Sequence, residues 1–313
     1  MTPLLIFCII MIFTSAHADS SKSSIWNEWH AMLPNTPMPD IIKELIKTDE
    51  LGHMSAGNFP NPFEVRAYPV IYHGNADHLS VDDVRQLFLE KDMKPGAVMK
   101  EVTLARTVGG SSFLSLEEAD SIPFSSAQLP QILDRLAVVP GSTEANHIED
   151  TLRGTEASYS RGWIKFCATS LESMINFVIS EFGNHDLKVI TTTFHGKDEQ
   201  QKTTYTIATE GKELPEEKLV ACHPQPYPYT IYNCHVLHKK GAKAYRVPLV
   251  RKDGTIVSAT VVCHFDTSKW NPNFLPFIFQ ELKVKPETNP GICHFLPKDH
   301  LLWTLNNDKL LLY

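Results

Sequence analysis

The chain has 313 residues, of which 42% are hydrophobic and 21% are charged, a composition typical of a globular protein with one large or two small domains. Its formal net charge is −7. Because it also contains no basic stripe or arginine-rich run, we expect no nucleic-acid partner.

Residues 1–18 have the pattern of a secretory signal peptide. An apolar run from Leu4 to Phe13 precedes Ala16-His17-Ala18, which matches the small-residue motif for cleavage. The run is too short for a membrane-spanning helix, which needs about 20 apolar residues. No later segment is long and apolar enough to span a membrane. We therefore expect a secreted protein with no membrane partner.

Residues 19–79 are expected to form a variable N-terminal leader and linker, followed by one domain over residues 80–313. Trp26, Trp29 and several prolines predict an irregular segment that docks on the domain, with a short helix at Asp40–Lys47. Glycine, proline and asparagine between residues 52 and 75 predict a linker.

The first half of the domain mixes short strands and helices. The sequence predicts a strand at Val98–Leu104 and helices at Leu116–Ser121 and Leu129–Leu136. The clearest helix is Ser170–Phe182, whose apolar residues recur at helical spacing along one face. Thr169 and Glu172 are expected to form its capping box, and Gly183 its end.

The second half is rich in β-branched and aromatic residues that predict strands. These are Leu187–Phe194, Thr203–Ala208, Tyr229–Tyr232, Val247–Val250 and Ile256–Val262. Asp253-Gly254 predicts a hairpin turn, and a helix is expected near Phe274–Leu282. Strands that follow one another without regular helical crossovers predict a mostly antiparallel sheet with a few packed helices, the α+β class.

Four of the six cysteines are each followed at once by histidine. The pairs are Cys222-His223, Cys234-His235, Cys263-His264 and Cys293-His294, separated by 10, 27 and 28 residues, and eight residues separate His294 from Trp303. Adjacent side chains on a strand point to opposite faces. Each pair on a strand would therefore send its sulfur one way and its imidazole the other.

In an oxidising compartment cysteines tend to form disulfides. Cleavage of the signal peptide would remove Cys8 and leave Cys167 with the four cysteines of the pairs. We predict two disulfides among Cys222, Cys234, Cys263 and Cys293, which allow three pairings that the sequence does not separate. Cys167 would then remain a thiol or bond to another molecule.

The four paired histidines are candidate metal ligands: His223, His235, His264 and His294. Imidazoles without an obligatory thiolate suit copper or zinc, and the affinity order favours copper. A Cys/His zinc site would need thiolates that oxidation removes. The alternative is that these histidines only form hydrogen bonds. His238 and His300 fit no spacing and are expected at the surface, and Trp303 in the core or beside the site.

The fourfold Cys-His pattern resembles the plant BURP domain family. The first gap and the spacing from His294 to Trp303 match that family, whereas the third gap is slightly long. Similar text occurs at Lys165–Met174, Ser121–Ser125 and Leu33–Pro39, so the resemblance covers nearly all of the mature chain. Family members usually have an earlier cysteine upstream of the one matching Cys167. Thr155 stands there in this chain, which puts the family's upstream disulfide in doubt.

The resemblance implies a disulfide-stapled BURP domain over residues 80–313. It also implies a secreted plant protein of the apoplast, cell wall or storage vacuole. Its expected role is noncatalytic, structural or regulatory, in development or stress, with a cell-wall polysaccharide or protein as partner. Some BURP proteins are copper-dependent peptide cyclases, so the alternative is copper-dependent cyclisation of a separate peptide. Residues 105–114, where a fused core peptide could sit, contain no tyrosine or tryptophan, so we predict no self-cyclisation.

Overall fold

The structure is a computed structural model, and it describes residues 20–47, 84–107, 112–159, 164–196, 202–268, 270, 272–273, 275–285, 288 and 290–306. The predicted signal peptide and the Gly-, Pro- and Asn-rich linker lie outside these residues, as does part of the segment 105–114. The proposed domain boundaries therefore stay predictions.

Within the described residues the strands form two antiparallel sheets. The eight-stranded sheet has the order β1 (Phe88–Leu89), β12 (Ile292–Leu296), β11 (Ile256–His264), β10 (Ala242–Val250), β6 (Thr203–Ile207) and β2 (Val98–Val102), with β5 (Thr193–His195) beside β11 and β7 (Lys212–Glu213) beside β10. The five-stranded sheet has the order β3 (Lys165–Ala168), β9 (Tyr232–His238), β8 (Lys218–Pro224), β13 (Leu301–Leu305) and β4 (Leu187–Ile190).

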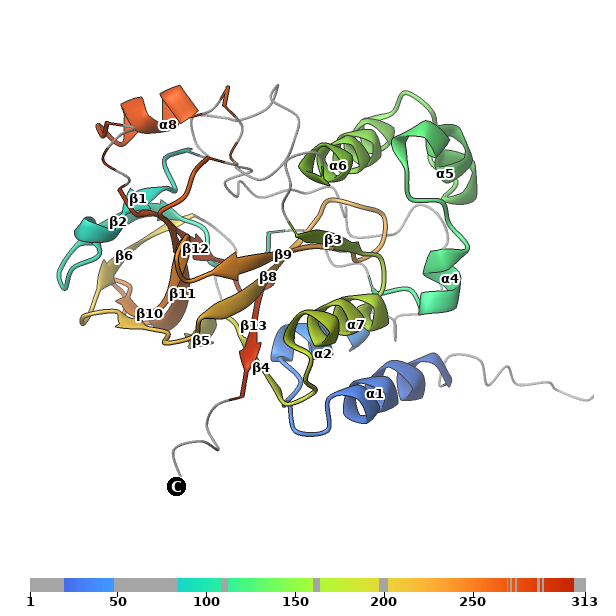
Figure 1. Cartoon of the computed structure of the whole chain (residues 1–313), viewed down its shortest axis with the longest axis horizontal. Helices are drawn as coiled ribbons and strands as arrows, with labels where there is room; N and C mark the ends of the chain where they lie inside the picture. Colours follow the sequence, from blue (N-terminus) through green and yellow to red (C-terminus); the bar gives the residue numbers. More distant parts are fainter. Residues whose placement is uncertain are drawn as a thin grey trace, which may run out of the picture.

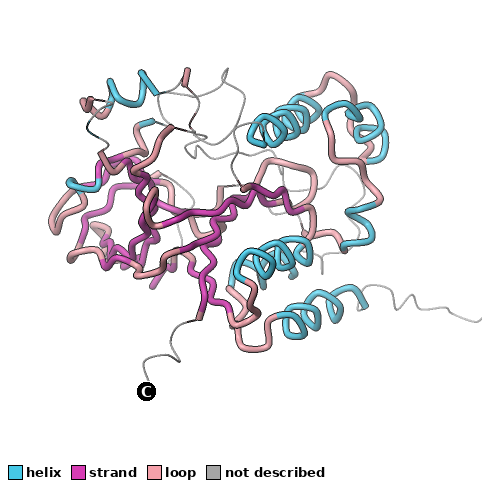
Figure 2. The backbone as a smooth tube through the Cα atoms, in the orientation of Figure 1, coloured by secondary structure: helices cyan, strands magenta, loops and turns pink. Residues whose placement is uncertain are grey.

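Most helices gather on one side of these sheets (Figures 1 and 2). They are α1 (Ser20–Met32), α2 (Asp40–Lys47), α4 (Leu116–Asp120), α5 (Leu129–Arg135), α6 (Thr143–Tyr159) and α7 (Leu171–Phe182). α8 (Leu275–Glu281) lies apart from them, near β1 (Figure 1). None of the described helices is long and apolar enough to cross a membrane. Antiparallel sheets with packed helices and two disulfides confirm the predicted fold class.

The β10–β11 hairpin confirms the turn predicted at Asp253-Gly254. The two strands pair from Val250 opposite Ile256 down to Ala242 opposite His264. Gly254 has a φ of 87°, a left-handed conformation that glycine adopts without strain. Asp253 Oδ1 accepts a hydrogen bond from the backbone N–H of Thr255 at 2.9 Å, which holds the turn.

Helix α7 occupies the predicted range but begins with a different cap. Ser170 is the N-cap and forms the capping box with Ser173, so the expected box of Thr169 and Glu172 is wrong. Gly183 ends the helix with a φ of 63°, as predicted. Glu172 is instead buried and faces the helix α1, because its carboxyl hydrogen-bonds Glu28.

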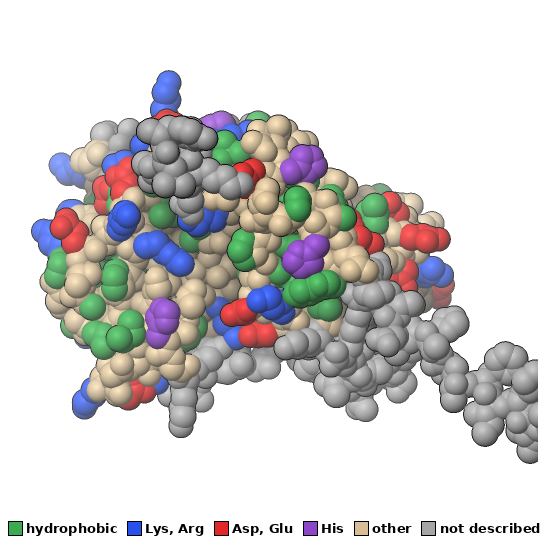
Figure 3. Space-filling model, turned by 90° about the horizontal axis from the view of Figure 1, so that it is seen from below, with side chains coloured by type: hydrophobic (Ala, Val, Ile, Leu, Met, Phe, Trp, Pro, Cys, Tyr) green, Lys and Arg blue, Asp and Glu red, His purple; other side chains and the backbone are tan. Residues whose placement is uncertain are grey.

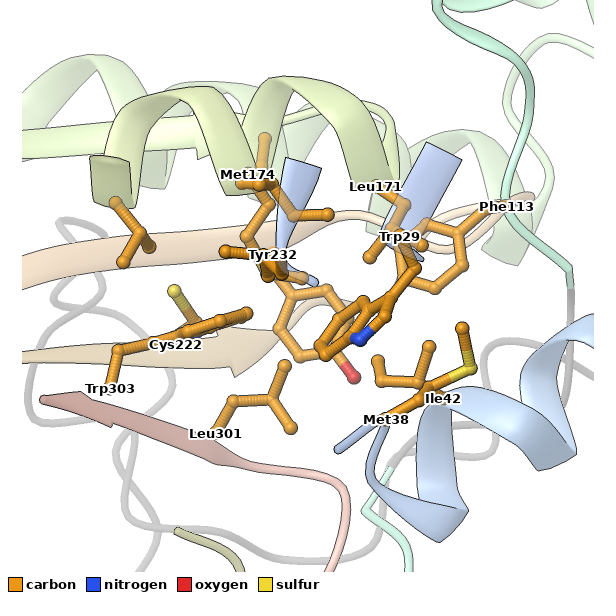
Figure 4. Close-up of a cluster of buried hydrophobic side chains, with 14 of the residues drawn as sticks. Trp29, Met38, Ile42, Phe113, Leu171, Met174, Cys222, Tyr232, Leu301 and Trp303 are labelled. Carbon is orange, nitrogen blue, oxygen red and sulfur yellow. The ribbon is translucent and has the colours of Figure 1, made fainter. Parts of the chain in front are cut away.

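The leader helices form part of the main core. The expected irregular segment is wrong, since residues 20–32 form α1, whereas the helix predicted at Asp40–Lys47 is present as α2. Trp29 is fully buried, and its ring centroid lies 5.8 Å from that of Trp303. Figure 4 shows Trp29, Met38 and Ile42 from the leader packed with Leu171 and Cys222 from the domain.

A second apolar layer lies between the two sheets. Its members come from both sheets: Ile190, Leu219, Ala221, Leu237, Ala242, Ala244, Val262, Leu296 and Leu302. This layer fixes which faces of β8, β9, β11 and β12 look toward each other. On the outside of the molecule, basic and acidic side chains are interspersed on the face drawn in Figure 3, so no single-sign field covers that face.

Candidate metal centre

The two disulfides each join residues that stand directly opposite on neighbouring strands. Cys222 pairs in register with Cys234 across β8 and β9, and Cys263 with Cys293 across β11 and β12. Their Cα atoms are 4.0 and 3.9 Å apart, and both pairs form disulfides. The register therefore selects one of the three pairings that the sequence left open.

Each histidine follows its cysteine and so points to the other face of the strand. In register terms His223 stands opposite Asn233 and His235 opposite Ala221, which makes the two histidines diagonal neighbours. Their Nε2 atoms lie 3.1 Å apart. His264 and His294 have the same diagonal relation across β11 and β12, with Nε2 atoms 3.3 Å apart.

The two faces of these strand pairs have different surroundings, as the alternation predicts. Cys222 and Cys234 pack into the core that contains Trp29 and Trp303. Cys263 and Cys293 pack into a separate core, formed mainly by side chains of the eight-stranded sheet. The histidines share their face with Ala221 and Val262 of the layer between the sheets, so the two pairs look toward each other.

The four histidines are buried, with 6% of His223 and 2% of each of the other three exposed. Burial lowers the pKa values of His235 and His264 well below the ordinary value. Burial likewise lowers the pKa of His294 to about 4. The nearby charge that His294 would carry also lowers both other pKa values, which places the two pairs within electrostatic reach. These three imidazoles are therefore neutral near pH 7, the form that binds metals.

The separations within each pair fit neighbouring ligands of one ion. A metal bonded to two imidazole nitrogens at about 2.0–2.1 Å holds them about 2.9–3.4 Å apart at ordinary coordination angles. The observed 3.1 and 3.3 Å lie in that range. Among the described residues, however, no group of three or more His, Cys, Asp or Glu side chains stands close enough to hold an ion. The donors are thus arranged as two pairs of nitrogens.

His300 was predicted at the surface, and this prediction is wrong. It is 1% exposed, and its Nδ1 lies 2.7 Å from Nδ1 of His223. Its Nε2 lies 3.2 Å from the Thr107 hydroxyl and 3.8 Å from Asp299 Oδ1. Asp299-His300 is a polar step within an apolar stretch that leads into β13, a signal in the sequence that could have indicated burial. His238, by contrast, is exposed as predicted.

Trp270 is a second neighbour of the site that sequence reasoning missed. Its indole is 2% exposed and lies edge-on to His264, with ring centroids 5.5 Å apart. The residue follows β11 in a connection before α8, and nothing in its local sequence indicates this contact. An aromatic ring can therefore pack directly against a candidate ligand.

Cys167 remains a thiol at the edge of this region. Its side chain hydrogen-bonds Thr155, the residue that stands where the resembling family usually has a cysteine. Burial raises the pKa of the thiol to about 12, so its reactive thiolate is scarce in the native protein. Tyr227 and Tyr229 lie nearby, buried in the loop between β8 and β9, so the strand predicted at Tyr229–Tyr232 begins only at Tyr232.

Comparison with known proteins places this arrangement among plant sequences. A family model described as the BURP domain matches residues 86–305. BURP domain-containing protein 5 of Oryza sativa subsp. japonica is 38% identical over 296 residues, which cover 92% of this chain and 88% of that protein. BURP domain-containing protein 3 of the same organism is 42% identical over 78% of this chain, and BURP domain protein RD22 of Arabidopsis thaliana 38% identical over 76%. The matched regions span only 56% and 60% of the latter two proteins.

Proposed function

Because the chain belongs to the BURP domain family of plant proteins, we propose that it is a secreted protein with a noncatalytic structural or regulatory role in the cell wall, apoplast or storage vacuole during development or stress. Two observations support secretion. The first 18 residues have the pattern of a signal peptide. Two buried disulfides suit an oxidising compartment.

The proposed partner is a cell-wall polysaccharide or a cell-wall protein, and fractionation tests it. The full chain with a C-terminal tag would be expressed in plant cells, whose washed walls are then extracted with salt and with chelator. The proposed role predicts signal-peptide cleavage before Asp19 and recovery of the tagged protein from the wall or vacuole. Recovery of an uncleaved protein from the cytosol alone would contradict it.

Copper(II) binding by some or all of His223, His235, His264 and His294 is the second part of the proposal. The observation that carries it is the presence of two facing pairs of buried imidazoles with Nε2 atoms 3.1 and 3.3 Å apart. Copper there would supply a redox-active Lewis acid. Because burial lowers the histidine pKa values, binding should persist at a lower pH than for exposed histidines.

Trp270 provides a local reporter for this binding. Copper(II) quenches the fluorescence of nearby indoles, and the indole of Trp270 lies 5.5 Å from the ring of His264. Titration of the metal-free protein with copper(II) should quench part of the emission, and Trp270→Phe should remove most of the quenched component. Exchanging all four histidines for alanine should abolish binding by calorimetry, while His238→Ala, an exposed histidine, should not.

Loss of the fold would also abolish binding, so a milder variant is needed. His264→Gln with His294→Gln removes one pair and keeps the residues polar and of similar size. Copper stoichiometry that is unchanged in both the pair variant and the fourfold variant would overturn the copper proposal. Circular dichroism of each variant verifies that the sheets have formed.

The second candidate function is copper-dependent cyclisation of a separate peptide. The edge-on contact of Trp270 with His264 favours it, because it shows that an aromatic side chain fits beside a candidate ligand. Incubation with copper, oxygen and a peptide that contains tyrosine or tryptophan is the test. A cross-linked peptide that has lost two hydrogens would support a cyclase. An unchanged peptide would favour the noncatalytic role.

Self-cyclisation is not expected, although Trp270 lies beside His264, because the Trp270 indole is 2% exposed and packed in a core cluster. Tyr227 and Tyr229 are buried beside Cys167, which restricts their reach, and Phe113 from the segment 105–114 is packed in the core. After incubation with copper and oxygen, peptides of this chain that contain tyrosine or tryptophan should keep their mass. An intrapeptide cross-link in any of them would contradict this expectation.

A further inference from the structure

A line of buried polar groups leads away from the first histidine pair. Asp299 Oδ2 accepts hydrogen bonds from the backbone N–H of Thr107 at 2.6 Å and from its hydroxyl at 3.0 Å. The same hydroxyl lies 3.2 Å from Nε2 of His300, and Nδ1 of His300 lies 2.7 Å from Nδ1 of His223. All four side chains are buried, with exposed fractions between 1% and 6%.

The direction of each hydrogen bond follows when Asp299 is ionised and His300 is neutral. An ionised carboxylate only accepts, so the single proton of the Thr107 hydroxyl goes to Asp299. The hydroxyl oxygen then accepts from Nε2–H of His300, which also faces Asp299 Oδ1 at 3.8 Å. A neutral imidazole with its proton on Nε2 has a bare Nδ1, which accepts from Nδ1–H of His223.

His223 is thereby left with a bare Nε2, and this nitrogen is the one that faces His235 at 3.1 Å. We infer that His300, oriented by Thr107 and Asp299, is a positioning residue that fixes the Nδ1–H tautomer of His223 and so prepares its Nε2 as a metal ligand. In the metal-free protein Nε2–H of His235 donates to this nitrogen. A metal ion would replace that proton.

In the second pair a backbone carbonyl has the role that His300 has in the first. Nδ1 of His294 lies 3.2 Å from the carbonyl oxygen of Phe295, and a carbonyl only accepts. His294 therefore also carries its proton on Nδ1 and presents a bare Nε2 to His264 at 3.3 Å. Metal-binding histidines commonly donate their other N–H in this way, which fixes the tautomer and raises ligand basicity.

The inference rests on the proposed copper site, but its first test needs no metal. Long-range proton–nitrogen correlation spectra of the metal-free full chain, with ¹⁵N-labelled histidine, distinguish a protonated ring nitrogen from a bare one. His223 should show a protonated Nδ1 and a bare Nε2. A protonated Nε2 on His223 would overturn the inference, whether or not copper binds.

Two variants test the role of His300 itself. His300→Phe removes the acceptor for Nδ1–H of His223, and His223 should then shift toward the Nε2–H tautomer that free histidine side chains prefer. Thr107→Val removes only a hydroxyl and should cause a smaller shift in the same direction. Unchanged His223 spectra in both variants would overturn the inference. His238→Phe, which alters an exposed histidine, should leave the spectra unchanged.

Metal affinity gives an independent readout. Loss of such a supporting partner typically weakens metal binding by about 10- to 100-fold, so calorimetric titration with copper(II) should show this loss for His300→Phe. Wild-type affinity in a folded His300→Phe would contradict the inference. If the wild-type protein bound no copper while His223 held the expected tautomer, the copper proposal would fail and the positioning role would stand.

Discussion

His223 and His294 each belong to one of the two diagonal histidine pairs, yet their second ring nitrogens contact different kinds of partner. Nδ1 of His223 contacts the side chain of His300, whereas Nδ1 of His294 contacts the backbone carbonyl of Phe295. One orientation thus depends on the side chains of Thr107, Asp299 and His300, which come from two distant places in the chain, and the other on the strand that carries the histidine. The Cys-His dipeptide sets the shared geometry, and residues outside the motif decide how each pair is supported.

The two disulfides extend this comparison. Cys222–Cys234 closes a hairpin with a sequence separation of 12 and packs under the leader helices. Cys263–Cys293 has a separation of 30 and joins strands that are connected through the region of α8. The first therefore constrains a local turn, whereas the second closes a long excursion of the chain.

Removing the two disulfides one at a time should give the largest difference in stability loss between the two regions. Loop-closure entropy predicts a loss of about 3.6 kcal/mol for Cys263→Ala with Cys293→Ala, and about 2.8 kcal/mol for Cys222→Ala with Cys234→Ala. Guanidinium unfolding of both double variants measures these losses. Cys167→Ala serves as the control without a disulfide change. A larger loss from the short loop would show that packing around Cys222 outweighs chain entropy.

Strand periodicity made much of this site predictable. The opposite directions of cysteine and histidine, the Asp253-Gly254 hairpin and the apolar face of α7 all follow from local spacing. The pairing of the cysteines did not, because it depends on the register between β11 and β12 across a long connection. Alternation along a strand is local, whereas register between strands is a tertiary property.

The residues that support the pairs were missed for the same physical reason. His300 contacts Thr107, which lies 193 positions away, and no spacing rule links them. Helix α1 did leave a local signal, since Ile25, Trp29 and Leu33 recur at helical spacing and are buried. The prolines that follow in residues 34–39 favoured the prediction of an irregular segment instead.

Acidification should lower the unfolding free energy of the metal-free protein, because His294 must become protonated. The pKa of His294 is lowered from 6.5 to about 4, so its contribution is present above pH 6.5 and is lost as the pH falls toward 4. This single shift corresponds to about 3 kcal/mol. His294→Gln should therefore flatten the fall of unfolding free energy between pH 6.5 and 4, measured with chelator present. His238→Gln should leave the slope unchanged, and equal slopes in all three proteins would contradict the prediction.

A third disulfide should stabilise the contact between helix α6 and strand β3. Thr155 on α6 hydrogen-bonds the Cys167 thiol on β3, so Thr155→Cys places two sulfurs in contact. The loop of 167 − 155 = 12 residues equals that of Cys222–Cys234. We expect stabilisation of about 2–3 kcal/mol. Loss of alkylation at Cys167 in unfolded, unreduced protein verifies the bond. A persistent thiol would mean that α6 and β3 are too far apart.

The smallest expected effect on stability concerns the contact between α1 and α7. This contact lies beside the core that contains Cys222–Cys234. The buried carboxyl of Glu172 has a pKa raised by burial and by its hydrogen bond with Glu28. A group with a raised pKa contributes stability that is present below its ordinary value of 4.5 and is lost as the pH rises through the raised value. Glutamine keeps a donor for Glu28 without ionising, so Glu172→Gln should gain about 1 kcal/mol near pH 7 and nothing at pH 4. Thermal unfolding at both pH values measures this, with the exposed Glu210→Gln as the control. A gain of equal size at both pH values would show that ionisation of Glu172 does not govern the docking of α1.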